Sequence, residues 1–449
     1  MLAPIVKADD TKGPKMTELS PAATAAYTGT TGIKAPGTTP PRTPRGYTPG
    51  LAAVNFGVLL ALLTPVLVSM AFKVQHLTSS TGEATGQLGL ILGVGALFAL
   101  VANPLAGRLS DRTTSRFGMR RPWILGGSVV GLGAFALIGV ASSLWVVLIG
   151  WCLAQAAFNA VLAAANATLP DQVPGPSRGK VSGIVGATTP LAILGGSFLI
   201  TFISDDVLRF VVPALLALAL CVVFILVLKD RRLGEKPRQR FTIGQFFGSF
   251  VFNPVKHRDF GWTWLTKFFV MFGYAGIATF LPFFLTEKFK LDEQGAITTI
   301  LLANLASTVA MVISSPLGGF LSDRIGKRRP FVAAAGLIMV VGLVVLAFAP
   351  SIGVVIAAQA IIGLGAGSFF SVDLALATQV LPSPDDVAKD LGVLNIANAL
   401  PQSIAPAIAP GIIALGATTA IGGYSVWYLF GAFIALLGAV LVYRIKGVK

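Results

Sequence analysis

The chain has 449 residues and a formal net charge of +15, but only 12% of its residues are charged. Its mean hydropathy of +0.79 excludes a soluble globular chain of this length and indicates many segments in contact with lipid. The basic residues stand in short loops between apolar runs. They therefore predict membrane topology and not a nucleic-acid partner.

The residues that carry metal, redox or catalytic chemistry are few. Both cysteines, Cys152 and Cys221, lie inside apolar runs, and the chain has only two histidines. This pattern argues against a disulfide framework and against a metal site. The sequence contains no phosphate-binding loop, nucleophile–base pair or HExxH pattern, so we expect neither an enzyme nor a bound cofactor.

Residues 1–50 are rich in Pro, Thr and Gly and contain no apolar run. Such a composition cannot bury enough surface to offset chain entropy, which predicts a disordered tail. The tail is not expected to be a signal peptide, because no hydrophobic core follows a basic start.

Twelve apolar segments follow, each long enough to cross a hydrocarbon core of about 30 Å as a helix. Helices are expected because lipid offers no partner for free backbone polar groups. The predicted spans are 51–75, 85–107, 122–141, 143–169, 181–203, 208–228, 263–285, 295–317, 331–349, 352–381, 391–415 and 423–444.

Charge orients these segments in the membrane. If the tail is cytoplasmic, then the tail, the even-numbered loops and the C-terminus hold 29 of the 34 Lys and Arg residues. The external loops hold only Lys73, Arg209, Lys288 and Lys290. The positive-inside rule then predicts a multi-pass protein of the inner or plasma membrane with both termini in the cytoplasm.

The stretch 229–262 is predicted to be a basic cytoplasmic linker between two halves. Ile243, Phe246, Phe247 and Phe250 fall on one face of a helix, after a run of Lys and Arg. An amphipathic helix on the inner membrane surface, held by anionic lipids, explains this pattern. A regulatory partner site is the alternative.

One motif occurs twice. Residues 104–122 read PLAGRLSDRTTSRFGMRRP, and residues 316–330 read PLGGFLSDRIGKRRP. Their Pro, Gly, Asp and Arg residues match at one constant spacing, and Leu169-Pro170 matches Leu381-Pro382 at the same spacing. The chain therefore consists of two similar halves in tandem.

Twelve segments in two halves, with GxLSDR…RRP after the second segment of each half, resemble the major facilitator superfamily. SDRTTSRFGMRRPWILGG, FNPVKHRDFGW and KDLGVLNIANALPQ are similar to one branch, which contains sucrose–proton symporters, glycoside–pentoside–hexuronide cation symporters and their bacterial relatives. The resemblance implies an all-α membrane protein with twelve transmembrane helices in two six-helix pseudo-repeats, at 51–228 and 263–449. It also implies transport by alternating access.

The resemblance further implies that the two motifs form a conformational latch, which holds the cytoplasmic ends of the halves together in the outward-facing state. The glycines are expected to end a helix and to allow close backbone approach. The aspartates can accept hydrogen bonds and pair with arginines. The alternative is that these charges only set topology. The candidate latch residues are Gly107, Asp111, Arg112, Arg120, Arg121, Arg178, Gly319, Asp323, Arg324, Arg328 and Arg329.

Polar residues at membrane depth tend to face the bundle interior or a water-filled path. Neutral amides offer both a donor and an acceptor, which suits a hydroxyl-rich solute. The alternative is hydrogen bonding between helices. The resemblance implies that segments one, four, seven and ten line a central cavity. The candidate solute-binding residues are Gln155, Asn159, Asn166, Tyr274, Gln359, Asn395, Asn398 and Gln402; Asn304, Ser307 and Thr308 form a further polar group in segment eight.

Asp373 is the only carboxylate well inside a predicted segment, and Lys267 lies near the start of segment seven. A carboxyl group in low dielectric can carry a proton, so these two residues are the candidates for proton coupling. The alternatives are a structural ion pair and a lysine that extends to the membrane surface. Sucrose symporters have an acidic residue in segment four, whereas here that segment has none before Asp171.

Together these patterns predict a secondary active transporter, monomeric and surrounded by lipid, that moves a sugar or glycoside with protons. An exporter of drugs or amphipathic metabolites on the same fold is the first alternative. A transporter-like sensor or lipid-handling protein is the second.

Overall fold

The computed structural model describes residues 43–232, 254, 256–381 and 387–447. In the N-terminal half the helices are α2 (Tyr47–Thr64), η1 (Pro65–Ser69), α3 (Met70–His76), α4 (Thr81–Ser110), α5 (Arg121–Val140), α6 (Leu144–Asn166), α7 (Thr168–Gln172), α8 (Gly175–Gly186), α9 (Thr188–Ile200) and α10 (Leu208–Val227). In the C-terminal half they are α12 (Arg258–Lys288), α13 (Glu293–Ile325), α14 (Arg329–Ala347), α15 (Ile352–Thr378), α16 (Val387–Ala417), α17 (Gly423–Leu441) and η2 (Val442–Arg444).

Twelve spans among the described residues are long and apolar enough to cross a membrane, which confirms the prediction of twelve. The first span consists of α2, η1 and α3; the fourth joins α6 to α7, and the fifth joins α8 to α9. Nearly all of the predicted tail and most of the predicted amphipathic helix lie outside the described residues.

Several spans begin earlier than the sequence predicts, and long-range contacts accompany two of these shifts. The helix α2 begins at Tyr47, inside the range assigned to the tail, because the Tyr47 hydroxyl bonds to Thr168 Oγ1 at 2.7 Å. The helix α12 begins at Arg258, inside the predicted linker. Its first turn is held because the Asp259 carboxylate accepts the backbone N–H groups of Lys446 and Gly447 at 2.9 and 2.7 Å.

Local chemistry explains several helix ends. Ser80 Oγ accepts the backbone N–H of Glu83, and the Glu83 carboxylate accepts the N–H of Ser79, which forms a capping box for α4. The Asp292 carboxylate accepts the N–H of Gly295 at the start of α13. The same helix ends at Gly326, whose φ of 69° suits a residue without a side chain.

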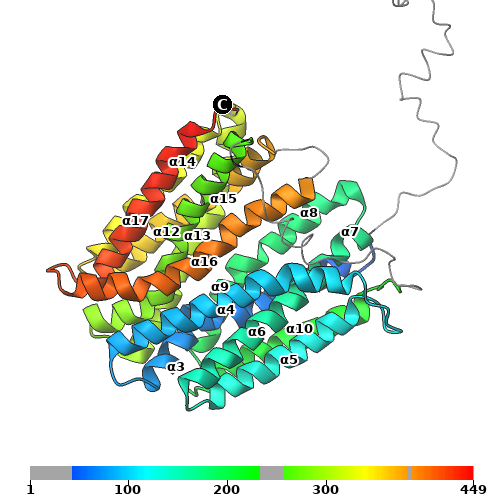
Figure 1. Cartoon of the computed structure of the whole chain (residues 1–449), viewed down its shortest axis with the longest axis horizontal. Coiled ribbons are helices and arrows are strands. Elements are labelled where there is room, and N and C mark those ends of the chain that lie inside the picture. The colour runs from blue at the N-terminus through cyan, green and yellow to red at the C-terminus, as the bar shows by residue number, and fades with distance from the viewer. Residues whose placement is uncertain (1–42, 233–253, 255, 382–386, 448–449) are drawn as a thin grey trace, which may run out of the picture. The chain divides into compact units, whose positions relative to one another are not determined.

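The same helix pairings recur in the two halves. The contacts α4–α6, α5–α6, α5–α10, α2–α10 and α2–α9 of the first half correspond to α13–α15, α14–α15, α14–α17, α12–α17 and α12–α16 of the second. This correspondence is the structural form of the tandem repeat. Between the halves, α4 runs alongside α16, α9 packs on α13, and α12 packs on η1 and α3 (Figure 1).

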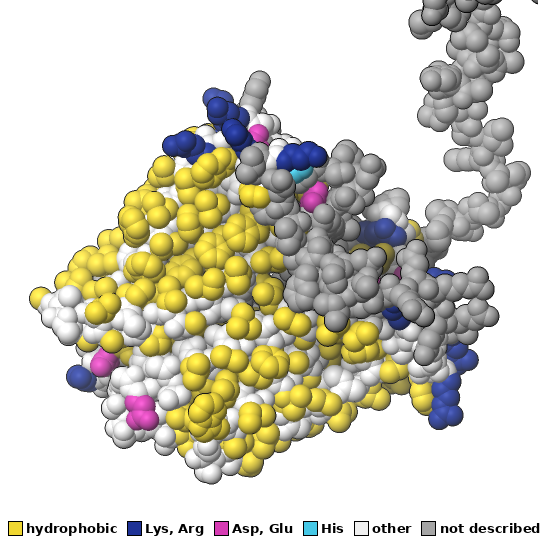
Figure 2. Space-filling model, in the orientation of Figure 1, with side chains coloured by type: hydrophobic (Ala, Val, Ile, Leu, Met, Phe, Trp, Pro, Cys, Tyr) yellow, Lys and Arg dark blue, Asp and Glu magenta, His cyan; other side chains and the backbone are white. Residues whose placement is uncertain are grey.

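Two ends of the bundle are distinguished below. The motif end holds residues 111–120, 229–232, 326–328 and 445–447, which include part of each repeated motif. The opposite end holds the connections 77–80, 141–143, 201–207, 289–292 and 418–422. Hydrophobic side chains cover the face between these ends, and Lys and Arg gather at one side of this band (Figure 2). Such a band is what lipid requires of a multi-span protein.

Glycines of α4 allow its close contact with α16. A Cβ added to Gly89 would lie 2.4 Å from the carbonyl oxygen of Pro406, and one added to Gly93 would lie 3.1 Å from Ala407 Cβ. The helix α16 contains three prolines, Pro401, Pro406 and Pro410. Because Pro410 has no N–H, it cannot donate to the Pro406 carbonyl one turn earlier. This carbonyl therefore stands toward Gly89 without its usual helical donor.

We predict that Gly89→Val lowers the melting temperature of the purified protein, because the added methyl groups must force α4 and α16 apart. Overpacking of this kind typically costs about 1–3 kcal/mol. The matched control is Gly86→Val on the same helix, where an added Cβ meets no atom within 4 Å. Equal melting temperatures for the two variants would show that the contact does not contribute to stability.

Candidate functional site

A cavity of about 760 Å³ lies at mid-depth between the two halves. Its volume falls within the range of about 300–1,000 Å³ that is typical of small-molecule sites. The first half contributes residues of α2, η1, α4, α6, α8 and α9, and the second half contributes residues of α12, α13, α15 and α16. A site built from both halves can change its access when the halves move.

The wall of this cavity is largely apolar, with polar but uncharged side chains set into it. Amide and hydroxyl side chains are interspersed with Trp151, Tyr274, Phe370 and two methionines. Within the described part of the chain, no Asp, Glu, Lys, Arg or His lines it. The polar lining residues are Gln155, Thr189, Thr279, Asn304, Ser307, Thr308, Ser315, Gln359, Asn398 and Gln402.

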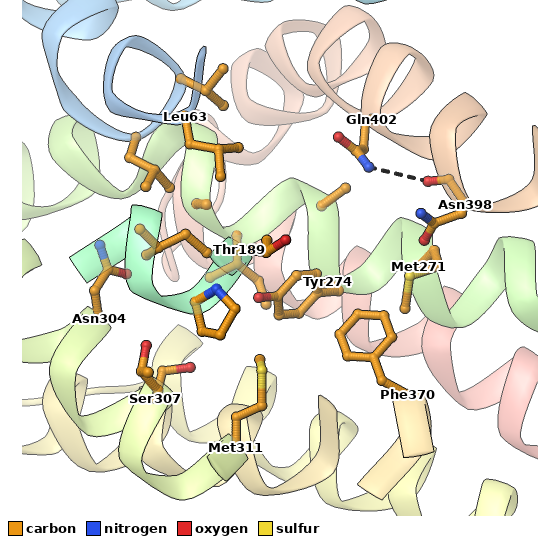
Figure 3. Close-up of a pocket in the computed structure, with 18 of the residues that line it drawn as sticks. Leu63, Thr189, Met271, Tyr274, Asn304, Ser307, Met311, Phe370, Asn398 and Gln402 are labelled. Atoms are coloured by element: carbon orange, nitrogen blue, oxygen red, sulfur yellow. Dashed lines mark hydrogen bonds between the residues drawn. The ribbon is translucent and has the colours of Figure 1, made fainter. Parts of the chain in front are cut away.

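The structure brings five of the eight predicted solute-binding residues to this cavity, namely Gln155, Tyr274, Gln359, Asn398 and Gln402. In Figure 3, Asn398 and Gln402 lie on one side of Tyr274, and Asn304 and Ser307 lie on the other. Gln402 Nε2 donates to the carbonyl oxygen of Asn398 at 3.3 Å, and the Gln402 side-chain oxygen remains available as an acceptor. The Tyr274 ring meets Phe370 edge to face, with ring centroids 6.1 Å apart.

The other three predicted residues are not among the residues that line the cavity. Asn159 donates to the backbone and side-chain oxygens of Gln155, at 2.9 and 3.1 Å. Asn166 accepts from Asn55 at 3.0 Å, which joins α6 to α2. Asn395 is exposed on α16. Asn166 thus makes the bond between helices that sequence reasoning held open as the alternative, whereas these bonds of Asn159 stay within α6.

Sequence reasoning assigned no binding role to α13, although this helix contributes much of the wall. Asn304, Ser307, Thr308, Met311 and Ser315 recur at helical spacing, so they lie on one face of α13. Sequence analysis grouped Asn304, Ser307 and Thr308 as polar residues of segment eight; their helical spacing was the signal that could have given them a binding role. Asn304 Nδ2 also donates to Ser197 Oγ at 2.9 Å, which joins α13 to α9 across the two halves.

Lys267 and Asp373 form an ion pair within the second half. Lys267 Nζ lies 2.7 Å from Asp373 Oδ2, and the two side chains are 15% and 6% exposed. Along α12 and α15 the pair lies on the motif side of Tyr274 and Phe370, and neither partner lines the cavity itself. A pair this well buried costs desolvation energy, and its mutual attraction repays this cost only while both partners remain.

In the first motif, Arg120 connects three spans. Its guanidinium pairs with Asp111 at the end of α4, lies 3.6 Å from the Asp171 carboxylate in α7, and donates to Ser110 Oγ at 2.7 Å. Arg120 is only 4% exposed. These contacts fix the motif against its own half of the molecule.

The start of the linker is also part of this arrangement. The Asp230 carboxylate accepts the backbone N–H groups of Arg120 and Arg121 at 2.8 and 2.9 Å, where it meets the positive end of α5. Gly118, with a φ of 108°, makes room for it, because an added Cβ would lie 2.1 Å from Asp230 Oδ2. Arg121 also donates to the carbonyl oxygen of Leu228.

In the part of the chain that the structure describes, the arginines of the second motif also make contacts within their own half. Arg328 Nη2 donates to Asp323 Oδ1 at 3.0 Å, and Arg329 Nη2 donates to the carbonyl oxygen of Lys446 at 2.6 Å. Arg324 lies in the last turn of α13. In the first half, Arg178 donates to the carbonyl oxygens of Val173 and Pro170; Arg112 follows α4 directly.

The expectation that Gly107 and Gly319 end a helix is wrong. The helix α4 continues to Ser110, and α13 continues to Ile325. An added Cβ would meet only ordinary contacts, at 3.9 Å for Gly107 and 3.7 Å for Gly319. Helix formation continues past both glycines because lipid favours an unbroken set of backbone hydrogen bonds.

Comparison with known proteins defines the family. The model of the Major Facilitator Superfamily matches residues 54–314 and 293–448, which together cover most of the sequence. The chain belongs to the Major Facilitator Superfamily. It is therefore a multi-pass membrane transporter, which agrees with the expectation that it is not an enzyme. Gln155, Gln359 and Gln402 thus line the central cavity of a facilitator-superfamily transporter.

Solved structures of other transporters share the fold of this facilitator-superfamily chain. A nucleoside transporter, NupG, superposes with a TM-score of 0.69 at 13% identity, over 89% of this chain and 100% of that one. A bacterial homolog of the human lysosomal transporter Spinster, inward-facing and unoccupied, gives 0.66 at 16% identity, over 89% and 96%. A D-xylose–proton symporter gives 0.65 at 15% identity, over 90% and 98%. At these identities the likeness shows the fold alone.

One curated relative matches in sequence. An uncharacterized symporter of Synechocystis sp. is 43% identical over 53 residues, which is 12% of this chain and 10% of that protein. The match spans about a tenth of the length of that relative.

At the opposite end, polar contacts join the two halves of this transporter. Arg209 and His76 of the first half both contact Glu293 of the second. Gln294 Nε2 donates to the carbonyl oxygen of Thr201 at 3.1 Å, and the hydroxyls of Thr85 and Tyr424 meet at 2.9 Å. The motif contacts described above each stay within one half. The halves are therefore fastened together at the opposite end.

We predict that Asp373→Leu and Lys267→Met each lower the melting temperature, because each leaves a buried charge without its partner. Breaking such a pair typically costs about 3–5 kcal/mol. The double variant should recover most of the loss, as a thermal double-mutant cycle would measure. Asp323→Asn, which breaks a pair whose carboxylate is 67% exposed, is the control and should shift the melting temperature little. Additive losses in the double variant would contradict the pairing.

Proposed function

We propose that this transporter moves a small uncharged, hydroxyl-rich solute, of the sugar or glycoside class, by alternating access. The observation that carries the proposal is the cavity wall, which offers neutral amides and hydroxyls from both halves and no charged side chain among the described residues. Each amide provides a donor and an acceptor for hydroxyl groups. A charged solute would lose its hydration here without gaining a counter-charge.

The aromatic residues support the same solute class. Tyr274 and Phe370 stand together in the wall, and Trp151 lies on α6 one turn before Gln155. Flat rings give an apolar surface against which the C–H face of a sugar ring can pack, while the amides bind its hydroxyls. NupG and the D-xylose–proton symporter, whose names state polar organic substrates, support the proposal by analogy.

Transport is proposed to be coupled to protons through Asp373, with Lys267 as its partner in the ion pair. Proton binding to Asp373 would release Lys267, and the pair joins α12 to α15 directly beside the cavity. A local charge change is thereby linked to the packing of two cavity-lining helices.

We also propose the motif end as the cytoplasmic side of a plasma or inner membrane, with both termini on that side. The distribution of Lys and Arg along the sequence supports this orientation. The contacts of Arg120 and Arg328 hold each motif against its own half. We propose that the two motifs act as the latch between the halves in the outward-facing state. We expect a monomer in contact with lipids, with the solute and the proton as its ligands.

An exporter of amphipathic metabolites is the second candidate. Leu63, Met271 and Met311 stand on different sides of the cavity (Figure 3) and give it the apolar surface that a partly apolar substrate would need. Lipophilic cations are poor candidates for this cavity, because none of its described wall residues is an acid.

A thermal-shift screen of the purified protein tests the solute class. A sugar or glycoside present at 100 times its dissociation constant should add about 2.7 kcal/mol to the stability of the folded state. Gln402→Leu should weaken binding about tenfold, because one hydrogen bond is lost. Asn395→Leu, on the same helix but outside the cavity wall, should bind as the unmodified protein does. Stabilisation by lipophilic cations alone would instead favour the exporter.

Asp373→Asn in proteoliposomes tests the coupling. The variant should lose accumulation driven by a pH gradient but keep solute exchange, because the neutral amide still permits the conformational change without a proton. Glu287→Gln, at the exposed far end of α12, is the control and should accumulate solute normally. Undiminished accumulation by Asp373→Asn would rule out this carboxylate as the proton carrier.

A further inference from the structure

A cluster of charged residues spans the two halves at the opposite end. Lys73 and His76 lie on α3, Asp206 precedes α10, Arg209 lies on its first turn, and Glu293 begins α13. Lys73 Nζ lies 3.8 Å from Asp206 Oδ2, and Arg209 pairs with Glu293. The side chains of Lys73 and Arg209 are 8% and 4% exposed, whereas that of His76 is 45% exposed.

The imidazole of His76 lies between two carboxylates. Nδ1 is 3.1 Å from Asp206 Oδ2, and Nε2 is 3.1 Å from Glu293 Oε2. An ionised carboxylate can only accept hydrogen bonds, and a neutral imidazole has a single N–H to donate. Both contacts are therefore hydrogen bonds only when the ring is protonated and donates from both nitrogens. The arrangement is that of an imidazolium site open to water.

The two carboxylates belong to different halves. Asp206 is tied to the first half through Lys73, and Arg209 is held by the carbonyl oxygen of Ile203 at 2.8 Å. Glu293 belongs to the second half. Opening this end must therefore move Glu293 away from His76 and Arg209. The hydrogen bonds of His76 to Asp206 and to Glu293 exist together only when the ring is protonated and this end is closed. Protonation of His76 and closure of this end therefore favour each other.

Lys73 and Arg209 oppose a further positive charge on His76. Asp206 lies nearer to His76, at 3.1 Å, than to Lys73 or Arg209, at 3.8 and 3.9 Å, whereas Glu293 is shared by His76 and the closer Arg209. Other charged groups near α3 have partners of their own. Glu83 bonds to Ser79, Asp205 accepts the N–H of Leu208, Asp292 accepts the N–H of Gly295, and Lys288 donates to the carbonyl oxygen of Ala347. Glu287 and Lys290 are exposed.

We propose that His76 is a proton-binding site at the opposite end of the bundle, and that proton binding there closes this end by bridging Asp206 to Glu293. The proposal rests on the alternating access and the membrane orientation proposed above, which place His76 on the external side. Histidine is the residue whose ordinary pKa, about 6.5, lies in the physiological range. An acidic exterior thus favours the state that is open toward the motif end, and an alkaline exterior favours opening at His76. This proton acts on access and is separate from the one assigned to Asp373.

The test measures the distance across the opposite end in the full-length protein in nanodiscs. Spin labels are placed at Ser142→Cys in the first half and Ala420→Cys in the second. Both positions are exposed and lie outside the charged cluster. The buried Cys152 and Cys221 are replaced by alanine. Distance distributions are recorded at about pH 5.5 and about pH 8.5, a window that spans histidine titration but not that of ordinary carboxyl groups.

With His76 present, the ratio of the long-distance to the short-distance population should rise at least about fivefold at the higher pH, the lower end of typical coupling between sites. His76→Gln should remove this pH dependence. His76→Arg, which is charged at both pH values, should keep the short distance at both. His257→Gln changes the only other histidine, at the motif end, and should leave the pH dependence intact.

A pH response that survives in His76→Gln would overturn the proposal, as would a protein whose distances do not change with pH. If His76→Gln does not elute as a monodisperse species, then His76→Arg decides: an opening at high pH equal to that of the unmodified protein refutes the site. No solute is needed for this measurement. If no sugar binds in the thermal-shift screen but the histidine-dependent opening is seen, then the solute assignment fails while the proton site stands.

Discussion

Polar groups cannot remain unsatisfied in hydrocarbon, and this constraint governs where each functional part of the transporter lies. The backbone meets the constraint by forming helices. Side-chain polarity gathers at the motif end, at the opposite end and in the uncharged cavity between them, and polar groups elsewhere at depth, such as Asn55 and Asn166, bond to one another. The one ion pair described at depth, Lys267–Asp373, is internally neutralised and stands outside the cavity wall. Charged groups at the two ends of the bundle remain close to water and avoid the cost of desolvation. In the Lys267–Asp373 pair, the attraction between the partners compensates this cost.

The architecture was readable from the sequence because periodicity and charge act locally. Apolar length predicted twelve spans, and the recurrence of GxLSDR predicted the tandem halves, which the matching helix pairings now show. Span limits were less accurate, because Tyr47 and Asp259 are anchored by residues that are distant in sequence. Such anchors leave no local pattern.

The cavity was only partly predictable, for a related reason. An amide inside a membrane helix must have a partner, but the sequence does not say whether this partner is a solute or a neighbouring helix. Gln402 and Gln359 line the cavity, whereas Asn159 and Asn166 bond within the bundle. Asn304, Ser307 and Thr308 of α13 were recognised as a polar group but were given no binding role. Gly107 and Gly319 were misread because glycine within a lipid-facing helix does not by itself end that helix.

The seam between α4 and α16 combines a glycine surface on one side with a proline-interrupted helix on the other. At Gly89 and Gly93, α4 has no side chain that could insert between the residues of α16. The Pro406 carbonyl accepts no helical hydrogen bond from Pro410, because proline has no N–H. Rotation of one helix on the other therefore changes van der Waals contact without breaking a backbone hydrogen bond at that turn. In mechanical terms the seam is a bearing, and the charged contacts that join the halves at the opposite end act as its stop.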